Sequence, residues 1–556
     1  MQFKQTLLRL LFLMIPFIGS SQTTYIPFGA KENSLIERLE IKFGTDSVLN
    51  FSKTKPYSRN QMISRIGRMD SSLFTKVDEY NLRLAMMSNF EWAVGQRSDF
   101  LSKKPIWKSF YETPANLYEV NKENFFLAIN PVIQYTVSKE NENDQHLFLN
   151  TRCITLRGRI ADKVGFAASI TDNQERDPLY VQQFIIERKA VPGGGFYKDF
   201  KDPGGVDYFD ARGYITTHVA KIIDIAFGYD KNFIGNGHRS LFLSDFSSNM
   251  LFLKLNTRIW KFNYQNLFME LTSGNRLGAD NLFPKKYAAM HHLDVSVTKW
   301  LNIGLFEGVV FGRKDYFEFG YLNPVIFYRS IEQQSGSFDN SVAGFDIKAN
   351  VAKKFQIYGQ FLLDEFSRVE SRKGNGWWGN KFGIQAGAKY IDAFKIKNLD
   401  LQVETNRVRP FTYSHRDSVA NYTHYNQPLA HPLGANFQEF LGIARYQPAP
   451  RWLLHAKAIY FKQGKDTGTT SFGGNIFLPN IPPFRKMDYG FDVGSGVTTK
   501  TALASMLVSY ELRPNLFIEA FSLYRRQSAN LNSFKKNTTL FSLGVRWNVE
   551  RREFDF

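Results

Sequence analysis

From about residue 117 onward, apolar and polar residues alternate along the chain, and this period of two constrains the fold more than any other feature. In "LFLKLNTRIW" and "HLDVSVTKW", for example, Leu253 and Leu255 alternate with Lys254 and Asn256, and the later segment repeats the arrangement. Successive side chains of a strand point to opposite faces. Each such strand therefore has one apolar face and one strongly polar face.

A soluble β-sandwich would give the same alternation, with its polar faces in water. Three details favour a transmembrane barrel, whose strands are apolar outside and polar inside and whose two interfaces carry aromatic residues. The polar face is often charged, the sequence finishes on an alternating segment that ends in Phe556, and aromatic residues gather at strand ends. The last group comprises Trp260, Trp300, Trp377, Trp378, Trp452 and Trp547.

The final segment, "TLFSLGVRWNVERREFDF", resembles the C-terminal signal that barrel-assembly machinery recognises. Its parity places the apolar residues toward lipid and the polar residues toward the lumen. The expected lipid-facing residues are Phe541, Leu543, Val545 and Trp547, and the expected lumenal residues are Ser542, Arg546 and Asn548.

A sheet that crosses a membrane must close on itself, because no water in the hydrocarbon can satisfy a free strand edge. One strand with its turn or loop every 24 residues or so, over residues 117–556, gives about 18 strands, and bacterial single-chain barrels usually have an even number. The expected fold class is an all-β transmembrane antiparallel barrel of about 18 strands with a small N-terminal α-helical segment.

The N-terminal residues divide into two segments. Residues 1–21 combine Lys4 and Arg9 with an apolar run and a small residue, Ser21, which predicts a secretory signal peptide. Residues 22–116 contain apolar residues at helix spacing, and Ser58 is a candidate N-cap, so we expect two or three short helices. No later segment approaches 18 uninterrupted apolar residues, which excludes a helical membrane protein.

The net charge of +18 favours acidic partners. Anionic polysaccharide, lipopolysaccharide phosphates and nucleic acid all meet this description, and export from the cytoplasm argues against nucleic acid. The single cysteine, Cys153, excludes an internal disulfide.

Two residue groups have some features of chemical sites. His238 and Ser240 have the spacing of a His-x-Ser pair on one strand face, but the glycine-containing turn before them disfavours an outer-membrane lipase. An acidic group at Asp172, Glu175 and Asp177 lacks the glycine and the terminal glutamate of a calcium loop. We expect no metal, no cofactor and no enzymatic activity.

The segment "FGYDKNFIGNGHRSLFLSDFSSNMLFLKL", residues 227–255, resembles a characteristic segment of the Wzi-like capsule assembly family of outer-membrane barrels. A glycine-containing turn there precedes a Ser-Leu-rich strand and a short polar stretch. The matching residues are Asp230, Gly235, Gly237, Arg239, Ser240 and Ser244.

Two later segments extend the resemblance. "GYLNPVIFYRS", residues 320–330, is similar to the family's later aromatic and proline strand. "YNQPLAHPLGANFQE", residues 425–439, resembles a loop of the branch that includes the gliding motility protein RemB.

The resemblance implies a non-enzymatic, plugged barrel in the outer membrane of a Gram-negative cell, formed by residues 117–556 with extracellular loops, and a periplasmic location for the helices of residues 22–116. It also implies association with surface polysaccharide, in capsule or exopolysaccharide assembly or as an accessory to gliding motility. Expected partners are outer-membrane lipid and lipopolysaccharide, acidic surface polysaccharide and motility adhesins.

Aromatic and basic residues of one predicted outer loop suit stacking on sugar rings and pairing with acidic groups. They are Tyr413, His415, Arg416, Tyr422, His424 and Tyr425. Ordinary interfacial or lipopolysaccharide contacts explain any one of them equally well. A transport channel and, with less support, an outer-membrane lipase remain as alternative functions.

Overall fold

The computed structural model describes residues 23–107, 109–201, 203–220, 222–274, 282–313, 316–336, 339–468, 470–531 and 533–556. The predicted signal peptide, residues 1–21, lies outside the described residues. No helix in these ranges is long and apolar enough to cross a membrane.

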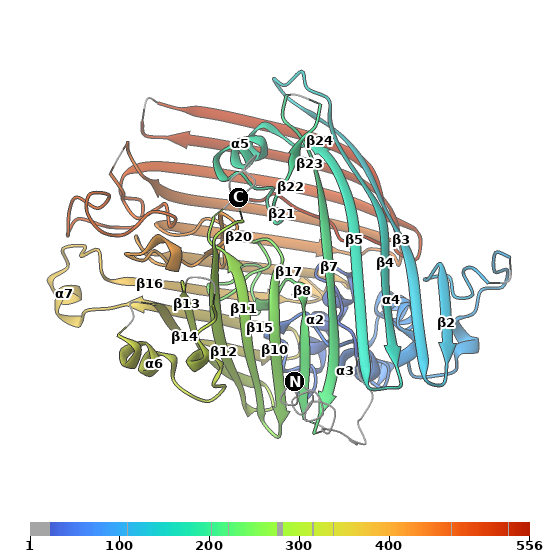
Figure 1. Cartoon of the computed structure of the whole chain (residues 1–556). Helices are drawn as coiled ribbons and strands as arrows, with labels where there is room; N and C mark the ends of the chain where they lie inside the picture. Colours follow the sequence, from blue (N-terminus) through green and yellow to red (C-terminus); the bar gives the residue numbers. More distant parts are fainter. Residues whose placement is uncertain are drawn as a thin grey trace, which may run out of the picture.

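Within the described ranges, eighteen long antiparallel strands form a closed barrel, which confirms the predicted fold class and strand number. Figure 1 shows the arrangement of these strands. Closure is made by β24 against β3, where Leu540 to Trp547 pair with Glu140 to Ile133. The strands are β3 (Phe125–Glu140), β4 (Leu147–Ile160), β5 (Val164–Arg176), β7 (Gly205–Val219), β8 (Ile223–Asp230), β10 (Met250–Ile259), β11 (Phe262–Thr272), β12 (Lys285–Thr298), β13 (Leu301–Phe311), β14 (Asn340–Val351), β15 (Phe355–Glu365), β16 (Lys381–Tyr390), β17 (Leu399–Val408), β20 (Phe437–Tyr446), β21 (Trp452–Lys465), β22 (Val497–Arg513), β23 (Leu516–Ala529) and β24 (Lys535–Trp547).

The two ends of the barrel differ in the length of their connections. At one end, which we name the turn mouth, neighbouring strands are joined by a few residues, such as the two between β10 and β11. At the other end, the loop mouth, long connections follow β8, β17 and β21.

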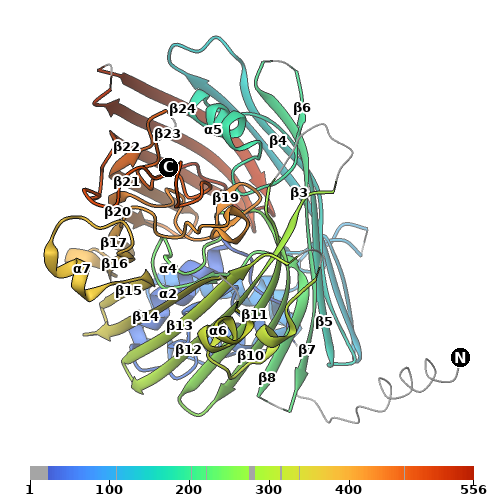
Figure 2. The same ribbon diagram turned by 60° about the vertical axis from the view of Figure 1, so that its left-hand side comes forward.

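Three short helices lie inside the barrel at the turn mouth (Figure 1, Figure 2). They are α2 (Lys31–Phe43), α3 (Arg59–Ile66) and α4 (Lys76–Ser88). Ser58 caps α3 by accepting a hydrogen bond from the Gln61 amide, as predicted.

Ion pairs connect the helix α2 to the inner wall of the barrel. Lys348 of β14 lies 2.5 Å from Glu40, and Lys389 of β16 lies 3.0 Å from Glu37. Because both partners of each pair are largely shielded from solvent, removing one charge would leave the other unpaired at a cost of about 3 to 5 kcal/mol. The helical segment is thus held as part of the barrel interior.

The predicted parity of the last strand is confirmed. Phe541, Leu543 and Val545 are about half exposed on the outer face, whereas Ser542 is buried and bonds to Ser138 at 2.7 Å. An exposed apolar face on a closed barrel is the arrangement that lipid requires.

The prediction that the chain stays on its last strand up to Phe556 is wrong. β24 ends at Trp547, and residues 548–556, which we name the tail, turn back into the lumen. The physical reason is a competitor for the same edge, because a short strand, β2 (Tyr118–Lys122), pairs with Phe125–Ile129 of β3. On the turn-mouth side of Ile133, the edge of β3 is therefore not free to pair with a continuation of β24.

Residues 320–330 also differ from the prediction, because they form no strand. They contain a 3-10 helix, η4 (Phe319–Leu322), and the start of a helix, α6 (Tyr328–Ser335). Tyr321 and Tyr328 pack with Phe268 and Val309 of the wall in one apolar cluster. Aromatic residues that suggested a strand thus cover the outside of β11 to β13.

Candidate functional site

The connection after β8 enters the lumen instead of leading directly into the next strand. Its short strand β9 (Phe233–Ile234) pairs with β1 (Thr54–Lys55), which lies between α2 and α3 in the chain. Phe242 and Leu243 of the connection are fully buried. Asp230 is the last residue of β8. The Ser-Leu-rich segment forms no strand because it packs in the barrel centre, which corrects that part of the expectation.

Glycine is required where this connection touches the wall. A Cβ atom at Gly237 would lie 2.6 Å from Oε2 of Glu404, and one at Gly235 would lie 2.8 Å from Nε2 of Gln360. Gly235 also has a φ of 148°. The two motif glycines therefore permit a close approach of backbone to the inner wall.

The two motif serines make structural hydrogen bonds. The fully buried Ser240 donates its hydroxyl to the Ile234 carbonyl at 2.5 Å, and its oxygen accepts from the Phe242 amide at 3.1 Å. Ser244 donates to the Ala430 carbonyl. Ser240 is thus enclosed and already bonded, which is not the geometry of an exposed nucleophile beside a base.

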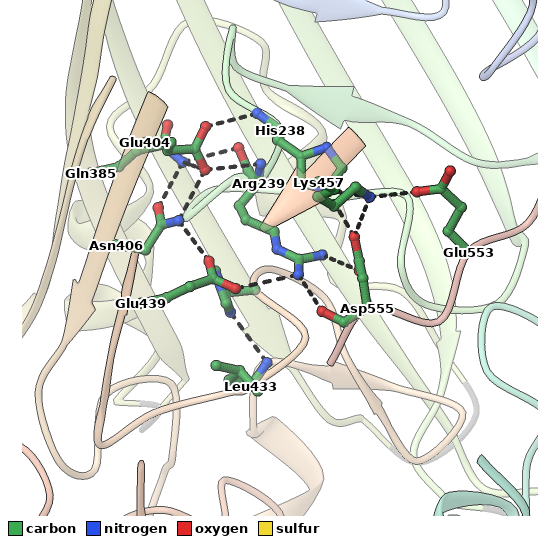
Figure 3. A network of polar contacts seen from close by, with 11 residues as sticks. His238, Arg239, Gln385, Glu404, Asn406, Leu433, Glu439, Lys457, Glu553 and Asp555 are labelled. Atoms are coloured by element: carbon green, nitrogen blue, oxygen red, sulfur yellow. Dashed lines mark hydrogen bonds and ion pairs between the residues drawn. The ribbon is translucent and has the colours of Figure 1, made fainter. Parts of the chain in front are cut away.

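Arg239 is the centre of a polar network in the lumen (Figure 3). Its Nη1 lies 2.9 Å from Oδ1 of Asp555 in the tail, and its Nη2 lies 3.3 Å from Oε1 of Glu439 on β20. Its own amide donates to Glu404 at 3.1 Å. One arginine thus joins the connection after β8, the tail and two wall strands.

Asp555 is bonded from three directions. Besides Arg239, Nζ of Lys457 lies 2.5 Å and Nε2 of His238 lies 3.0 Å from its Oδ2. Burial raises the pKa of this carboxyl, but the positive charges of Arg239 and Lys457 outweigh burial and hold the pKa well below its usual range. The tail is therefore ionised and paired at neutral pH.

The rest of the tail is held in the same way. Arg552 pairs with Glu175 on β5, and Glu553 pairs with Lys457. The Phe556 ring lies 4.9 Å from that of Phe184, measured between centroids, on the lumenal helix α5 (Leu179–Arg188) (Figure 1). Both polar and apolar contacts therefore fix the tail inside the barrel.

The candidate sugar-binding residues lie in the connection between β17 and β20, as predicted, but most of them point inward. Tyr413, His415, Tyr422, His424 and Tyr425 are buried, and only Arg416 is exposed.

Their polar atoms bond to other lumenal segments. The Tyr413 hydroxyl donates to the Leu241 carbonyl at 2.8 Å, and the Tyr422 hydroxyl donates to the Phe242 carbonyl at 2.6 Å. Burial lowers the pKa of His424 to about 4, which leaves its ring neutral. These residues form the core of the lumenal plug, so their rings are not presented to an external sugar.

An exposed basic and aromatic group at the loop mouth was missed. The helix α7 (Arg368–Lys373) carries exposed Arg368, Arg372 and Lys373, and Trp377 and Trp378 follow it half-buried. The Arg485 guanidinium lies 4.1 Å from the centroid of a Trp378 ring. We name this group the loop-mouth patch. In the sequence, its signal is a pair of tryptophans shortly after three basic residues, and both tryptophans were predicted to be interfacial aromatic residues instead.

The described ranges hold no group of three or more His, Cys, Asp or Glu side chains placed to bind a metal ion. Asp172 and Glu175, which the sequence placed in one acidic cluster, make separate contacts, because Asp172 pairs with Arg152 and Glu175 pairs with Arg552.

The family model of the capsule assembly protein Wzi matches residues 124–528, most of the barrel. The chain belongs to the Wzi capsule assembly family. It is accordingly an outer-membrane β-barrel. No curated protein matches the chain.

The solved structure of Escherichia coli Wzi, described as a carbohydrate-binding β-barrel involved in group 1 capsule assembly, has the same fold. Its TM-score is 0.56 at 13% identity, over 96% of this chain and all of that one. Pseudomonas aeruginosa OprD matches with a TM-score of 0.41 at 11% identity, over 76% of this chain and 94% of that chain. Acinetobacter baumannii OccAB2 gives 0.42 at 9% identity, over 76% and 98%. The last two likenesses are too weak to bear on function.

Proposed function

We propose that this Wzi-family barrel is a non-enzymatic anchor that binds acidic surface polysaccharide at its loop mouth. The observation that supports this proposal best is the filled lumen. The helices occupy the turn mouth, and the connection after β8, the connection between β17 and β20 and the tail occupy the centre of the barrel. A barrel filled by its own chain presents a surface instead of a pore. The carbohydrate binding described for the Escherichia coli relative supports the same class of ligand.

In this proposal the loop mouth faces the cell exterior, and the turn mouth with residues 22–116 faces the periplasm. Short turns on the periplasmic side and longer loops outside are the rule for such barrels. The same orientation places the loop-mouth patch where external glycan can reach it.

The chemistry of the loop-mouth patch suits an acidic glycan. Arg368 and Arg372 are exposed and can pair with carboxylates, while Trp377 offers an aromatic surface of the type that packs on sugar rings. The overall charge of +18 adds long-range attraction for a polyanion.

The direct test compares two charge-matched triple variants. Replacing Arg368, Arg372 and Lys373 by Gln is expected to weaken binding of purified acidic polysaccharide about tenfold, because each exposed charge pair contributes roughly 0.5 kcal/mol. Replacing the exposed turn-mouth lysines Lys353, Lys354 and Lys397 by Gln removes the same charge at the opposite end. Equal losses in the two variants would contradict a specific patch.

A cellular test separates the two biological roles. We propose capsule or exopolysaccharide assembly as the principal role and an accessory role in gliding, through motility adhesins, as the RemB-like alternative. A deletion strain that loses surface polysaccharide but spreads normally supports the first role. A strain that stops spreading with its polysaccharide intact supports the second.

A further inference from the structure

A shallow apolar groove of about 830 Å³ runs across the outer face of β16 to β22. Its floor follows one row of directly paired residues, Ala388, Val403, Gly442, Ala458 and Ala504. Phe440 and Tyr460, which are both exposed, form its wall. The groove thus arises because small side chains meet on several neighbouring strands.

On the described strands that form this groove, outward-facing cations lie on the side of the loop mouth. Lys462 of β21 is paired directly with Lys500 of β22, four residues along each strand from the floor residues Ala458 and Ala504. Lys462 is also paired with Gln438 of β20, and Gln438 is paired with Arg407 of β17, so Arg407 lies in the same row across the strands. Arg526 of β23 is paired with Ala502, which is two residues nearer to the groove than Lys500.

These four side chains are on the outer face by parity. On β21, Phe461 packs in the lumenal core, so Lys462 points outward together with Tyr460. On β22, Thr501 is fully buried, so Lys500 points outward with Ala502. Arg407 and Arg526 are exposed.

No ion pair joins any of the four cations to an acidic side chain within the described ranges. Like charges placed directly opposite each other destabilise a strand pair. An anion from outside the chain would relieve the repulsion between Lys462 and Lys500, which lie at the loop-mouth end of the apolar groove.

We propose that the phosphorylated glycolipid of the outer leaflet, the lipid A part of lipopolysaccharide, docks here. Its phosphate lies between Lys462 and Lys500, and an acyl chain occupies the groove above Gly442. The choice of glycolipid follows from charge complementarity and position, because the cations lie at the end that the proposed orientation places in the outer leaflet. The site goes beyond the proposed function, since it lies on the lipid-facing wall and not in the loop-mouth patch.

The test measures lipid binding to the full-length mature protein in detergent by native mass spectrometry. The probes are lipid A, lipid A without its phosphates, and phosphatidylglycerol. We expect the wild type to prefer lipid A over both. Joint replacement of Lys462, Lys500 and Arg526 by Gln is expected to lower lipid A affinity about tenfold and to abolish the preference for the phosphorylated form.

A second variant tests the groove itself. A Cβ at Gly442 would meet no atom within 4 Å, so Gly442→Leu fills the groove without straining the protein. It is expected to weaken both forms of lipid A. Arg152→Gln is the matched control, because this outward cation already pairs with Asp172 at 3.0 Å and should not contribute.

Three outcomes would overturn the proposal: equal wild-type binding of all three lipids, unchanged binding in the triple variant, or a protein dimer that Gly442→Leu dissociates, which would identify a second copy as the occupant. Polysaccharide binding by these variants is expected to stay at the wild-type level. Failure here is therefore distinguishable from failure of the proposed function.

Discussion

Asp555→Asn is expected to release the tail from the lumen without unfolding the barrel. The substitution keeps the size of the side chain and removes the charge that Arg239 contacts at 2.9 Å and Lys457 at 2.5 Å. Removing one member of a buried pair costs about 3 to 5 kcal/mol when the partner is left alone. Here Arg239 keeps Glu439 and Lys457 keeps Glu553, so we expect a smaller loss of about 2 to 3 kcal/mol.

This loss raises the population of the detached tail about 30- to 150-fold, since 1.4 kcal/mol corresponds to a factor of ten. Hydrogen exchange of residues 548–556 at neutral pH, read by mass spectrometry, should accelerate by that factor, while exchange in β21 stays unchanged. Asp492→Asn, at a carboxyl exposed in a loop, is the control and should change nothing. Unchanged exchange of the tail in Asp555→Asn would refute the assignment of Asp555 as its main attachment.

Further predictions concern the lumen. Planar bilayers containing the wild-type protein should show almost no stable single-channel conductance, and a large steady conductance would contradict a filled lumen. Gly237→Ala should lower the thermal midpoint, at a cost of about 1 to 3 kcal/mol, because its Cβ would meet Glu404 at 2.6 Å; Gly442→Ala, with open space, should leave the midpoint unchanged. The pKa of His424 is lowered by burial to about 4, so its contribution to stability is complete above pH 6.5 and is lost as the pH falls toward 4. The opening equilibrium of residues 421–429, obtained from hydrogen exchange after division by the intrinsic exchange rate at each pH, should therefore rise between pH 7.5 and pH 4.5. An equal rise of this opening equilibrium in His424→Gln would argue against this histidine as the cause.

The barrel could be predicted because its signal is local. Alternation such as that of Phe541, Ser542 and Leu543 reports which face each residue occupies, and closure follows from the membrane. The helices were predicted for the same reason, since spacing and a cap at Ser58 are properties of neighbouring residues.

The errors concern contacts between distant segments. The tail leaves the sheet because β2, which is more than 400 residues earlier in the chain, pairs with the turn-mouth end of β3. Tyr413 and Tyr422 are buried because the connection after β8 offers carbonyls at Leu241 and Phe242. The composition of a loop does not show whether the loop folds outward or into the lumen. The burial of these loop residues could therefore not be predicted from the sequence.

The most direct test of the central claim is the affinity of the purified protein, reconstituted in lipid, for acidic surface polysaccharide as salt is raised. A polyanion held by exposed arginine and lysine should bind at low ionic strength and weaken steadily as the Debye length falls from about 30 Å at 0.01 M to about 8 Å at 0.15 M. Absence of binding at low salt, or binding that salt does not change, would contradict the account.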